Sequence, residues 1–165
     1  MPKRRPPTVA EEIHQTRPFQ SPGHEAAVTL RRTVAVLDRH YAPIFESAGL
    51  TAAQYNVLRI LRGAGSAGLA TLAIRDRLVD LSPGITRLID RLEATDLVTR
   101  ERDADDRRQV TCRITPAGTA LLAKLDRAVD QADAGVVRTL TSVEQRTLVR
   151  LLDLARSGLT ADDHP

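Results

Sequence analysis

The sequence has one cysteine, few aromatic residues and no long apolar run. Cys112 is the single cysteine among 165 residues, which excludes an internal disulfide and a zinc site built from several cysteines. Aromatic residues make up only 2% of the chain, so the core must consist of Leu, Val, Ile and Ala. Such a core favours helices packed through leucine ridges over an aromatic-rich β-sandwich.

No apolar segment approaches the roughly 20 residues that a membrane-spanning helix needs. The basic residues at positions 3–5 are followed by Pro6 and Pro7 instead of an apolar stretch, which excludes a secretory signal. We therefore expect a soluble, cytoplasmic protein without membrane contact. The net charge of +3 permits an anionic partner. It is weak evidence for one, because part of the excess lies in a terminal cluster of the kind that is usually solvated.

The N-terminal part divides into an arm and a helix. Prolines recur through residues 1–22 without apolar periodicity, which predicts a flexible Pro-rich, basic arm that is extended or disordered. A helix over residues 23–48 is predicted by one apolar stripe: Leu30, Val34, Leu37, Tyr41 and Ile44. Pro43 lies inside this stripe and predicts a kink or a break near Tyr41.

Shorter elements follow from residue 49. Thr51 and Gln54 have the spacing of a capping box, and the helix that they open ends at the glycines of residues 62–65. Residues 68–70 could form a very short strand, and a further helix is expected over residues 71–79. The apolar residues expected on these two helices are Val57, Leu58, Leu61, Leu72, Leu78 and Val79.

The next helix has a polar face and an apolar face. Ser82 is predicted as its N-cap, with Pro83 at the first helical position, where a missing N–H costs nothing. The apolar face consists of Ile85, Leu88, Ile89 and Leu92 at helical spacing, and the opposite face holds Thr86, Arg87, Asp90 and Arg91.

The period then changes from helical to alternating. Residues 97–102 and 109–115 read as two strands joined by a polar loop, and in the second strand Val110, Cys112 and Ile114 alternate with polar residues. Thr115–Pro116 starts a long helix, and Thr141 with Glu144 caps the last one. We assign residues 116–158 to these two helices and 159–165 to a tail.

This order predicts a mainly α fold with a small β-hairpin wing, the winged helix-turn-helix plan. An amphipathic helix with a narrow polar stripe fits the DNA major groove, and its N-terminus suits phosphate. Gly84 allows close approach there. Arg107 and Arg108, near the hairpin tip, could reach the electronegative minor groove.

Four blocks in this order resemble the MarR family of bacterial transcriptional regulators: residues 85–93, 97–100, 105–108 and 114–118. The resemblance in architecture extends from about His24 to Ser157. It implies a homodimer whose first and last helices interlock, with residues 23–48 and 116–158 in dimerisation and residues 49–115 in DNA binding. It also implies one winged domain per subunit in successive major grooves of a pseudo-palindromic operator in double-stranded DNA.

The resemblance also assigns residues of the site. Ser82, Gly84, Thr86, Arg87 and Arg91 match positions that commonly face DNA, Arg108 matches the wing-tip arginine, and Asp106 matches the aspartate that braces it. The chain departs from the family pattern at Asp96, which stands where glycine is usual, and in the turn from Val79 to Ser82.

Charge alone does not identify this interface. Between Ser82 and Arg113 seven arginines face seven acids, so the region is neutral overall. DNA binding must therefore come from geometry, with arginines facing outward and acids bracing some of them. For Arg100, Arg102 and Arg113, a solvated surface role competes evenly with contact to DNA.

Neither the single cysteine nor the histidines favour a redox or a metal site. Cys112 alternates with apolar strand residues, which favours a packing role over a peroxide sensor, and the scattered histidines show no metal-ligand spacing. No nucleophile–base set or glycine-rich phosphate loop is present, so we expect no enzyme, no cofactor and no metal.

The aromatic residues suggest a second site. The resemblance implies a groove between the dimerisation helices and the winged domain that can take a small aromatic or phenolic effector. Tyr41, Phe45 and Tyr55, with His40, could line it, although core and interface packing is the more frequent role of such residues. Together with the resemblance, the sequence predicts a homodimeric repressor, associated with the bacterial nucleoid through DNA and released by a small effector. The alternatives are a dimeric winged-helix adaptor for protein contacts and a metal- or redox-responsive sensor.

Overall fold

The computed structural model describes residues 5–80, 84–102 and 110–160. It is mainly helical with a small antiparallel sheet of order β1-β3-β2. The elements are α1 (Val9–Glu12), α2 (Pro22–Glu46), α3 (Ala52–Ala64), the 3-10 helix η1 (Gly65–Ala67), β1 (Leu69–Ala70), α4 (Thr71–Arg75), α5 (Ile85–Ala94), β2 (Val98–Arg102), β3 (Val110–Ile114), α6 (Pro116–Val137) and α7 (Ser142–Thr160).

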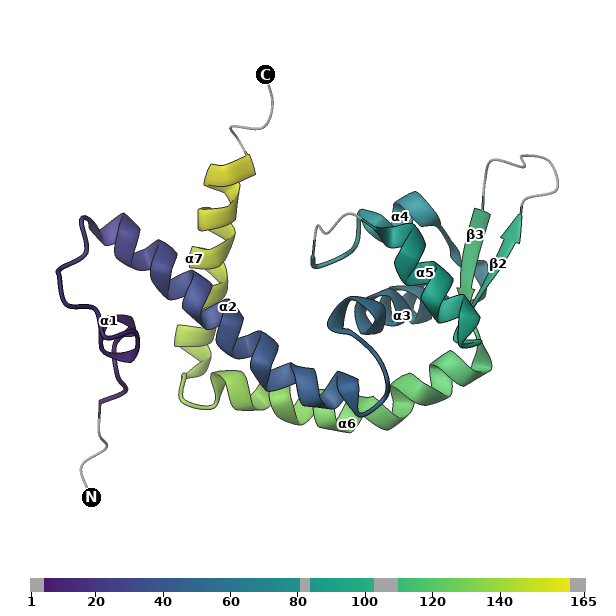
Figure 1. The fold of residues 1–165 in the computed structure, drawn as a ribbon, viewed down its shortest axis with the longest axis horizontal. Coiled ribbons are helices and arrows are strands. Elements are labelled where there is room, and N and C mark those ends of the chain that lie inside the picture. Colours follow the sequence, from purple (N-terminus) through teal and green to yellow (C-terminus); the bar gives the residue numbers. More distant parts are fainter. Residues whose placement is uncertain (1–4, 81–83, 103–109, 161–165) are drawn as a thin grey trace.

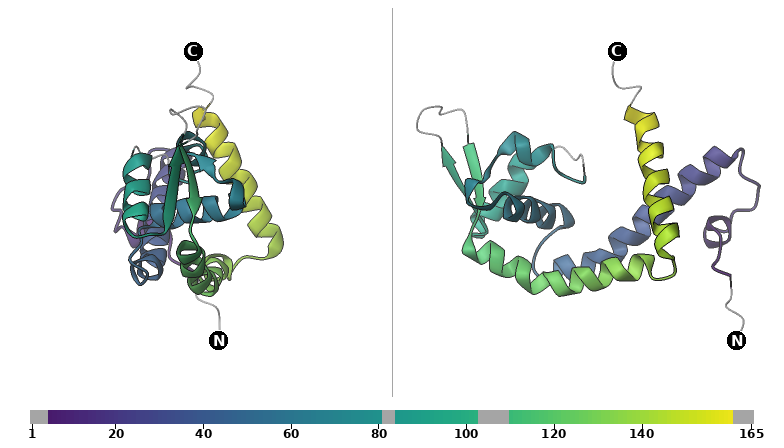
Figure 2. Two further views of the ribbon diagram at one scale, coloured as in Figure 1. Left: turned by 90° about the vertical axis from the view of Figure 1, so that its right-hand side faces the viewer. Right: turned by 180° about the vertical axis from the view of Figure 1, so that it is seen from behind.

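Two lobes are joined by the long helix α6. One lobe holds α3, α4, α5 and the β2–β3 hairpin, and the other holds α1, α7 and the N-terminal part of α2 (Figure 1). The right view of Figure 2 shows the hairpin and α7 in separate lobes, with α6 running between them. The predicted fold class is confirmed.

In the part of the chain that the structure describes, no helix is long and apolar enough to cross a membrane.

The N-terminal arm is partly helical, so the expectation of an extended or disordered segment was wrong for residues 9–12. Thr8 and Glu11 form a capping box, with the Thr8 N–H donating to Glu11 Oε2 at 2.6 Å. Val9 is buried, and Glu12 Oε2 lies 3.0 Å from Arg32 Nε on α2. Local capping and this distant ion pair together hold the short helix against α2.

α2 runs without a break through Pro43, so the predicted break near Tyr41 is absent. Proline removes one backbone hydrogen bond from a helix, but here only three residues follow before the helix ends, so little helix is lost beyond it. The predicted stripe exists, yet Leu30 and Val34 remain 40% and 55% exposed in the single chain. The C-terminal half of α2 packs along α6.

The core is centred on α3, as its capping box and apolar spacing predict. Thr51 and Gln54 cap the helix reciprocally, and Val57, Leu58 and Leu61 are fully buried. They pack with buried residues from the other elements of this lobe and from α6: Ile74, Ile89, Leu92, Val98, Cys112 and Leu122. The predicted strand at residues 68–70 is confirmed as β1, which pairs with β3.

The helix predicted for residues 71–79 is shorter than expected. α4 ends at Arg75, and turn and bend residues follow it. Ile74 and Leu78 face the core, whereas Leu72 and Val79 are 62% and 88% exposed. Val79 was expected on this helix but lies beyond its end, and Leu72 is on α4 with its side chain on the surface.

The start of α5 also differs from the prediction. Its first residue is Ile85, and its N-cap is Gly84 with φ of 129°, a conformation that side chains other than glycine rarely adopt. The assignment of Ser82 as N-cap was wrong because the helix begins beyond it. Ser82 and Pro83 themselves lie outside the described residues.

Strands β2 and β3 pair antiparallel, with Val98 opposite Ile114 and Arg102 opposite Val110. Asp96, just before β2, has a positive φ of 56°, where glycine would be unstrained. α6 then starts at the predicted Thr115 cap, whose hydroxyl accepts from the Gly118 N–H at 3.0 Å. A Cβ on Gly118 would lie 2.5 Å from the Leu97 carbonyl oxygen, so the helix contacts the wing backbone directly.

Candidate nucleic-acid interface

Helix α5 buries one face and exposes the other as predicted. Ile85, Ile89 and Leu92 are at most 8% exposed and pack toward α3 and α4. Thr86, Arg87 and Arg91 are exposed on the helix, and Gly84 is exposed at its N-terminus. Neither Arg87 nor Arg91 forms an ion pair with another residue that the structure describes. Both guanidinium groups are therefore available to an anionic partner.

Arg100 on β2 is instead engaged by two acids of α5. Its Nη1 lies 2.7 Å from Asp90 Oδ1, and its Nε donates to Glu93 Oε2 at 2.8 Å. The hydrogen bond from Arg100 is the main reason that the pKa of Glu93 is below its usual value of 4.5. The same bond raises the pKa of Arg100, which stays charged. The acids on this edge of α5 therefore face the hairpin guanidinium.

Arg113 on β3 is held in a similar way. Its Nε donates to the Ser66 carbonyl at 2.9 Å, and its Nη1 lies 2.5 Å from Glu101 on the neighbouring strand. The sequence left a surface role and a DNA contact equally open for Arg100 and Arg113. In the structure both guanidinium groups have protein partners, which favours a role other than direct DNA contact. Arg102 is exposed at the end of β2.

The hairpin extends beyond α5 at the edge of its lobe (Figure 1). The predicted wing-tip arginines Arg107 and Arg108, and the bracing Asp106, lie outside the described residues. Cys112 on β3 is completely buried, and burial raises the pKa of its thiol. This environment suits packing and disfavours the thiolate that a redox sensor needs.

A second candidate site lies between α2, α3 and α6. It is a groove of about 720 Å³, lined by three of the four predicted residues, Tyr41, Phe45 and Tyr55. The rings of Tyr41 and Phe45 are 6.1 Å apart and those of Phe45 and Tyr55 are 4.5 Å apart, both stacked. Phe45 and Tyr55 are also part of the core, each 6% exposed, so they pack the fold as well as line the groove.

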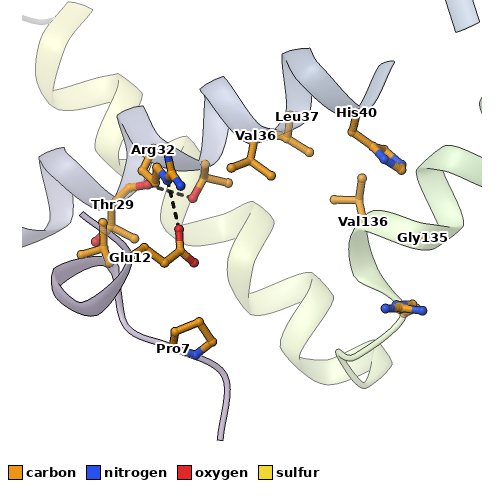
Figure 3. A pocket seen from close by; sticks show the side chains of 12 residues that line it. Pro7, Glu12, Thr29, Arg32, Val36, Leu37, His40, Gly135 and Val136 are labelled. Carbon is orange, nitrogen blue, oxygen red and sulfur yellow. Dashed lines mark hydrogen bonds and ion pairs between the residues drawn. The ribbon is translucent and has the colours of Figure 1, made fainter. Parts of the chain in front are cut away.

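His40 lies elsewhere. It lines a separate groove of about 690 Å³ with Val36, Leu37 and Val136, on a side of α2 that α1 also approaches (Figure 3). His40 therefore does not line the groove of the three aromatic residues, although its ring meets the Tyr41 ring edge-on with the ring centres 5.5 Å apart. In the groove that His40 lines, Arg32 pairs with Glu12, as a dashed line in Figure 3 marks.

Several residues of the aromatic groove were missed by sequence reasoning. The Arg59 guanidinium lies 5.9 Å from the centre of the Tyr55 ring, and the spacing of four residues on one helix was the available signal. Tyr41 donates a hydrogen bond to Asp133, 92 residues away, for which no local signal exists. Burial, together with this bond, raises the pKa of Tyr41 to about 12. The phenol therefore remains a neutral donor.

The same groove reaches the segment before α5. The Val79 N–H donates to Asn56 Oδ1 at 3.0 Å, and both residues line the groove. A molecule bound there would contact the chain five residues before Gly84. Among the described residues, no group of His, Cys, Asp and Glu could hold a metal ion.

Comparison with known proteins agrees with this architecture. Residues 50–110 match the model of the MarR family. A Thauera aromatica protein assigned to transcriptional regulation of the hcr operon is 31% identical over 130 residues, 78% of this chain and 76% of that protein. The transcriptional regulator HosA of Escherichia coli O157:H7 is 30% identical over 107 residues, covering 65% of this chain and 78% of HosA.

Solved structures of MarR-type regulators are also similar to this chain. The crystal structure of a MarR transcription factor from Planctomyces limnophilus is 41% identical, with a TM-score of 0.64 over 83% of this chain and 99% of that one. Bordetella bronchiseptica BpsR, described in connection with regulation of DNA binding by 6-hydroxynicotinic acid, is 26% identical with a TM-score of 0.70 over 80% of this chain and 98% of BpsR. A mutant Escherichia coli MarR in complex with operator DNA is 26% identical with a TM-score of 0.67 over 76% and 89% of the two chains. The capped core helix, the exposed arginine face of α5, the hairpin and these matches agree, and the chain belongs to the MarR family of transcriptional regulators.

Proposed function

We propose that this protein is a homodimeric transcriptional repressor that binds a pseudo-palindromic operator and is released by a small effector. The observation that carries the proposal is the outer face of α5, where Arg87 and Arg91 are exposed without ion-pair partners among the described residues. A helix of this kind presents guanidinium groups to base edges and phosphates in the major groove. In a bacterial cell the protein would associate with the nucleoid.

Each part of the chain has a role in this proposal. Arg87 reads a base edge, Arg91 and Thr86 contact the backbone, and Gly84 lets the phosphate approach the start of α5. We assign Ser82 and Pro83 to the same contact, Arg107 and Arg108 to the minor groove, and Asp106 to bracing Arg108. Residues 49–115 form the DNA-binding domain in this division, between dimerisation helices at 23–48 and 116–158.

The dimer is supported by apolar surface on α2 and α7. α7 packs only weakly against the rest of the described chain, and the left view of Figure 2 shows it projecting from the end of α6, apart from α2. Its exposed apolar side chains include Val143, Leu148, Val149, Leu151, Leu154 and Leu159. Because an apolar surface of this extent is rare on a monomer, a second copy of the chain is its natural partner. Two copies would place their α5 helices in half-sites about one DNA turn apart.

The groove lined by Tyr41, Phe45 and Tyr55 is the proposed effector site. BpsR is associated with 6-hydroxynicotinic acid, and the homoprotocatechuate operon repressor of Escherichia coli is 27% identical to this chain. A hydroxylated aromatic carboxylate would place its ring against these side chains and its carboxylate near Arg59. Through Asn56 and Val79 it would bias the segment that leads to α5.

The alternatives have less support. A buried Cys112 disfavours a redox sensor, and the exposed arginines of α5 favour DNA over a purely protein-binding adaptor. We propose no enzymatic activity, because the family to which the chain belongs consists of transcriptional regulators.

Arg87→Ala tests the DNA-binding proposal. On genomic fragments selected by the unmodified protein, the variant should lose roughly 1–3 kcal/mol of binding free energy and discriminate less between bases at one position. The affinity of the unmodified protein should fall steeply with salt, in proportion to the phosphates that it neutralises. Binding is measured by fluorescence anisotropy over a series of salt concentrations.

Arg127→Ala is the matched control, because Arg127 is exposed on α6, outside the lobe that holds α5. It should bind the selected fragments like the unmodified protein. An equal loss for Arg87→Ala on every sequence would make Arg87 a phosphate contact. Salt-independent binding, or none, would favour the protein-binding adaptor.

Arg59→Gln tests the effector site. With 6-hydroxynicotinic acid or homoprotocatechuate as the probe, the variant should bind about threefold to tenfold more weakly, equivalent to ~1 kcal/mol for a partly exposed charge pair. Calorimetry of both proteins gives the dissociation constants. Arg127→Gln should leave them unchanged. A similar loss with neutral catechol would contradict charge pairing by Arg59, and the absence of saturable binding would make the groove a packing feature.

A further inference from the structure

The Arg100 guanidinium lies between the wing and the edge of α5, and it meets two carboxylates there. Asp90 and Glu93 are three residues apart, so they lie on one side of the helix, the side that faces β2. The side chain of Arg100 is 30% exposed, less than Asp90 at 49% or Glu93 at 37%. Arg100 is thus the inner member of this cluster.

Without Arg100, the two carboxylates would change the DNA-facing surface. Asp90 is three residues from Arg87 on the same helix, a spacing at which aspartate and arginine pair. A free Asp90 would therefore compete with a phosphate or a base for Arg87. Glu93 would add a second unpaired negative charge beside a polyanion.

We propose that Arg100 is a positioning residue that masks Asp90 and Glu93, so that Arg87 and Arg91 remain available to DNA. The inference rests on the proposed DNA-binding function and adds a residue that acts without touching DNA. The proposal also explains how the segment from Ser82 to Arg113 could bind a polyanion although its arginines and acids are equal in number. The acids on this edge of α5 point toward Arg100 on β2, so the outward face of the helix keeps its positive charge.

The test compares Arg100→Met with a triple variant in which Arg100→Met is combined with Asp90→Asn and Glu93→Gln. Arg100→Met should weaken binding to the selected genomic fragments about tenfold, because the two carboxylates are exposed to the phosphates. The triple variant should recover most of this loss, since it has no carboxylate left to mask. Near-ultraviolet circular dichroism and thermal melts of each variant check that the fold is retained.

A direct DNA contact by Arg100 gives the opposite pattern. The triple variant would then bind as weakly as Arg100→Met, and the slope of log affinity against log salt would decrease by about one in both. Either that pattern, or unchanged affinity in Arg100→Met, overturns the proposal.

A measurement without DNA separates this inference from the proposed function. Titration of the Glu93 carboxyl by NMR should give a pKa below 4.5 in the unmodified protein and a return to the ordinary value in Arg100→Met. An ordinary Glu93 pKa in both proteins would contradict the proposed role of Arg100, even if the protein binds DNA. If the mask is present but the unmodified protein binds no DNA, the proposed function fails and the contact has another purpose.

Discussion

Leu151→Glu is expected to convert the dimer to monomers and to reduce affinity for a two-half-site operator by about a hundredfold to ten-thousandfold. Leu151 is 51% exposed on α7, in line with Leu148 and Leu152 at helical spacing. A carboxylate there would be buried without a partner in the dimer, at a cost that an interface of apolar side chains cannot offset. The mass is measured by sedimentation velocity, and the affinity by anisotropy on one-site and two-site DNA.

Arg146→Gln is the control for this variant. It removes one unit of positive charge, as Leu151→Glu adds one of negative charge, but Arg146 is exposed on the opposite side of α7 from Leu148 and Leu151. It should remain dimeric. If Leu151→Glu also remained dimeric, α7 would not form the interface, and the exposed face of α2 would have to carry it alone.

Ile89→Ala should lower the free energy of unfolding by about 2–5 kcal/mol, a large part of the stability of a domain this size. Ile89 is 1% exposed and lies where α5 packs on the core, so truncation leaves a cavity beneath the proposed recognition helix. The same change should weaken DNA binding, because the helix loses its fixed position. Urea denaturation at one fixed protein concentration measures the stability, since a dimer is stabilised by mass action.

Leu72→Ala gives the comparison. Leu72 lies on α4 in the same lobe but is 62% exposed, so its truncation should change stability by no more than ~0.5 kcal/mol. Equal losses in the two variants would mean that α5 is not anchored through Ile89.

Features encoded by neighbouring residues could be predicted from the sequence. The caps at Thr51, Thr115 and Thr141 are formed by residues three positions apart, and the structure contains all three. The exposed face of α5 also follows from spacing, so Arg87 and Arg91 could be placed before any coordinates.

Features that depend on distant contacts could not. Helix α1 was missed although its Thr8–Glu11 capping box is local, because the surrounding prolines predicted an extended segment. What holds α1 against α2 is the Glu12–Arg32 ion pair, and no local pattern predicts a pair between separate elements. The engagement of Arg100 by α5 depends on how β2 packs against that helix. His40 is next to Tyr41 in sequence, and their rings meet edge-on, yet His40 lines a different groove, which sequence adjacency alone could not reveal.

Helix α6 connects the apolar surface of α7 with the β2–β3 wing, so a tilt at one end of this helix moves the element at the other end. Its 22 residues span about 33 Å, and near its N-terminus Gly118 lies against the Leu97 backbone, with no space for even one methyl group. A tilt of about 5° at the α7 end would therefore displace the wing by ~3 Å, without slack at the joint to absorb it. A displacement of that size is comparable to the rise of one base pair, so small movements between the two copies of the chain would suffice to put the wings out of register with DNA.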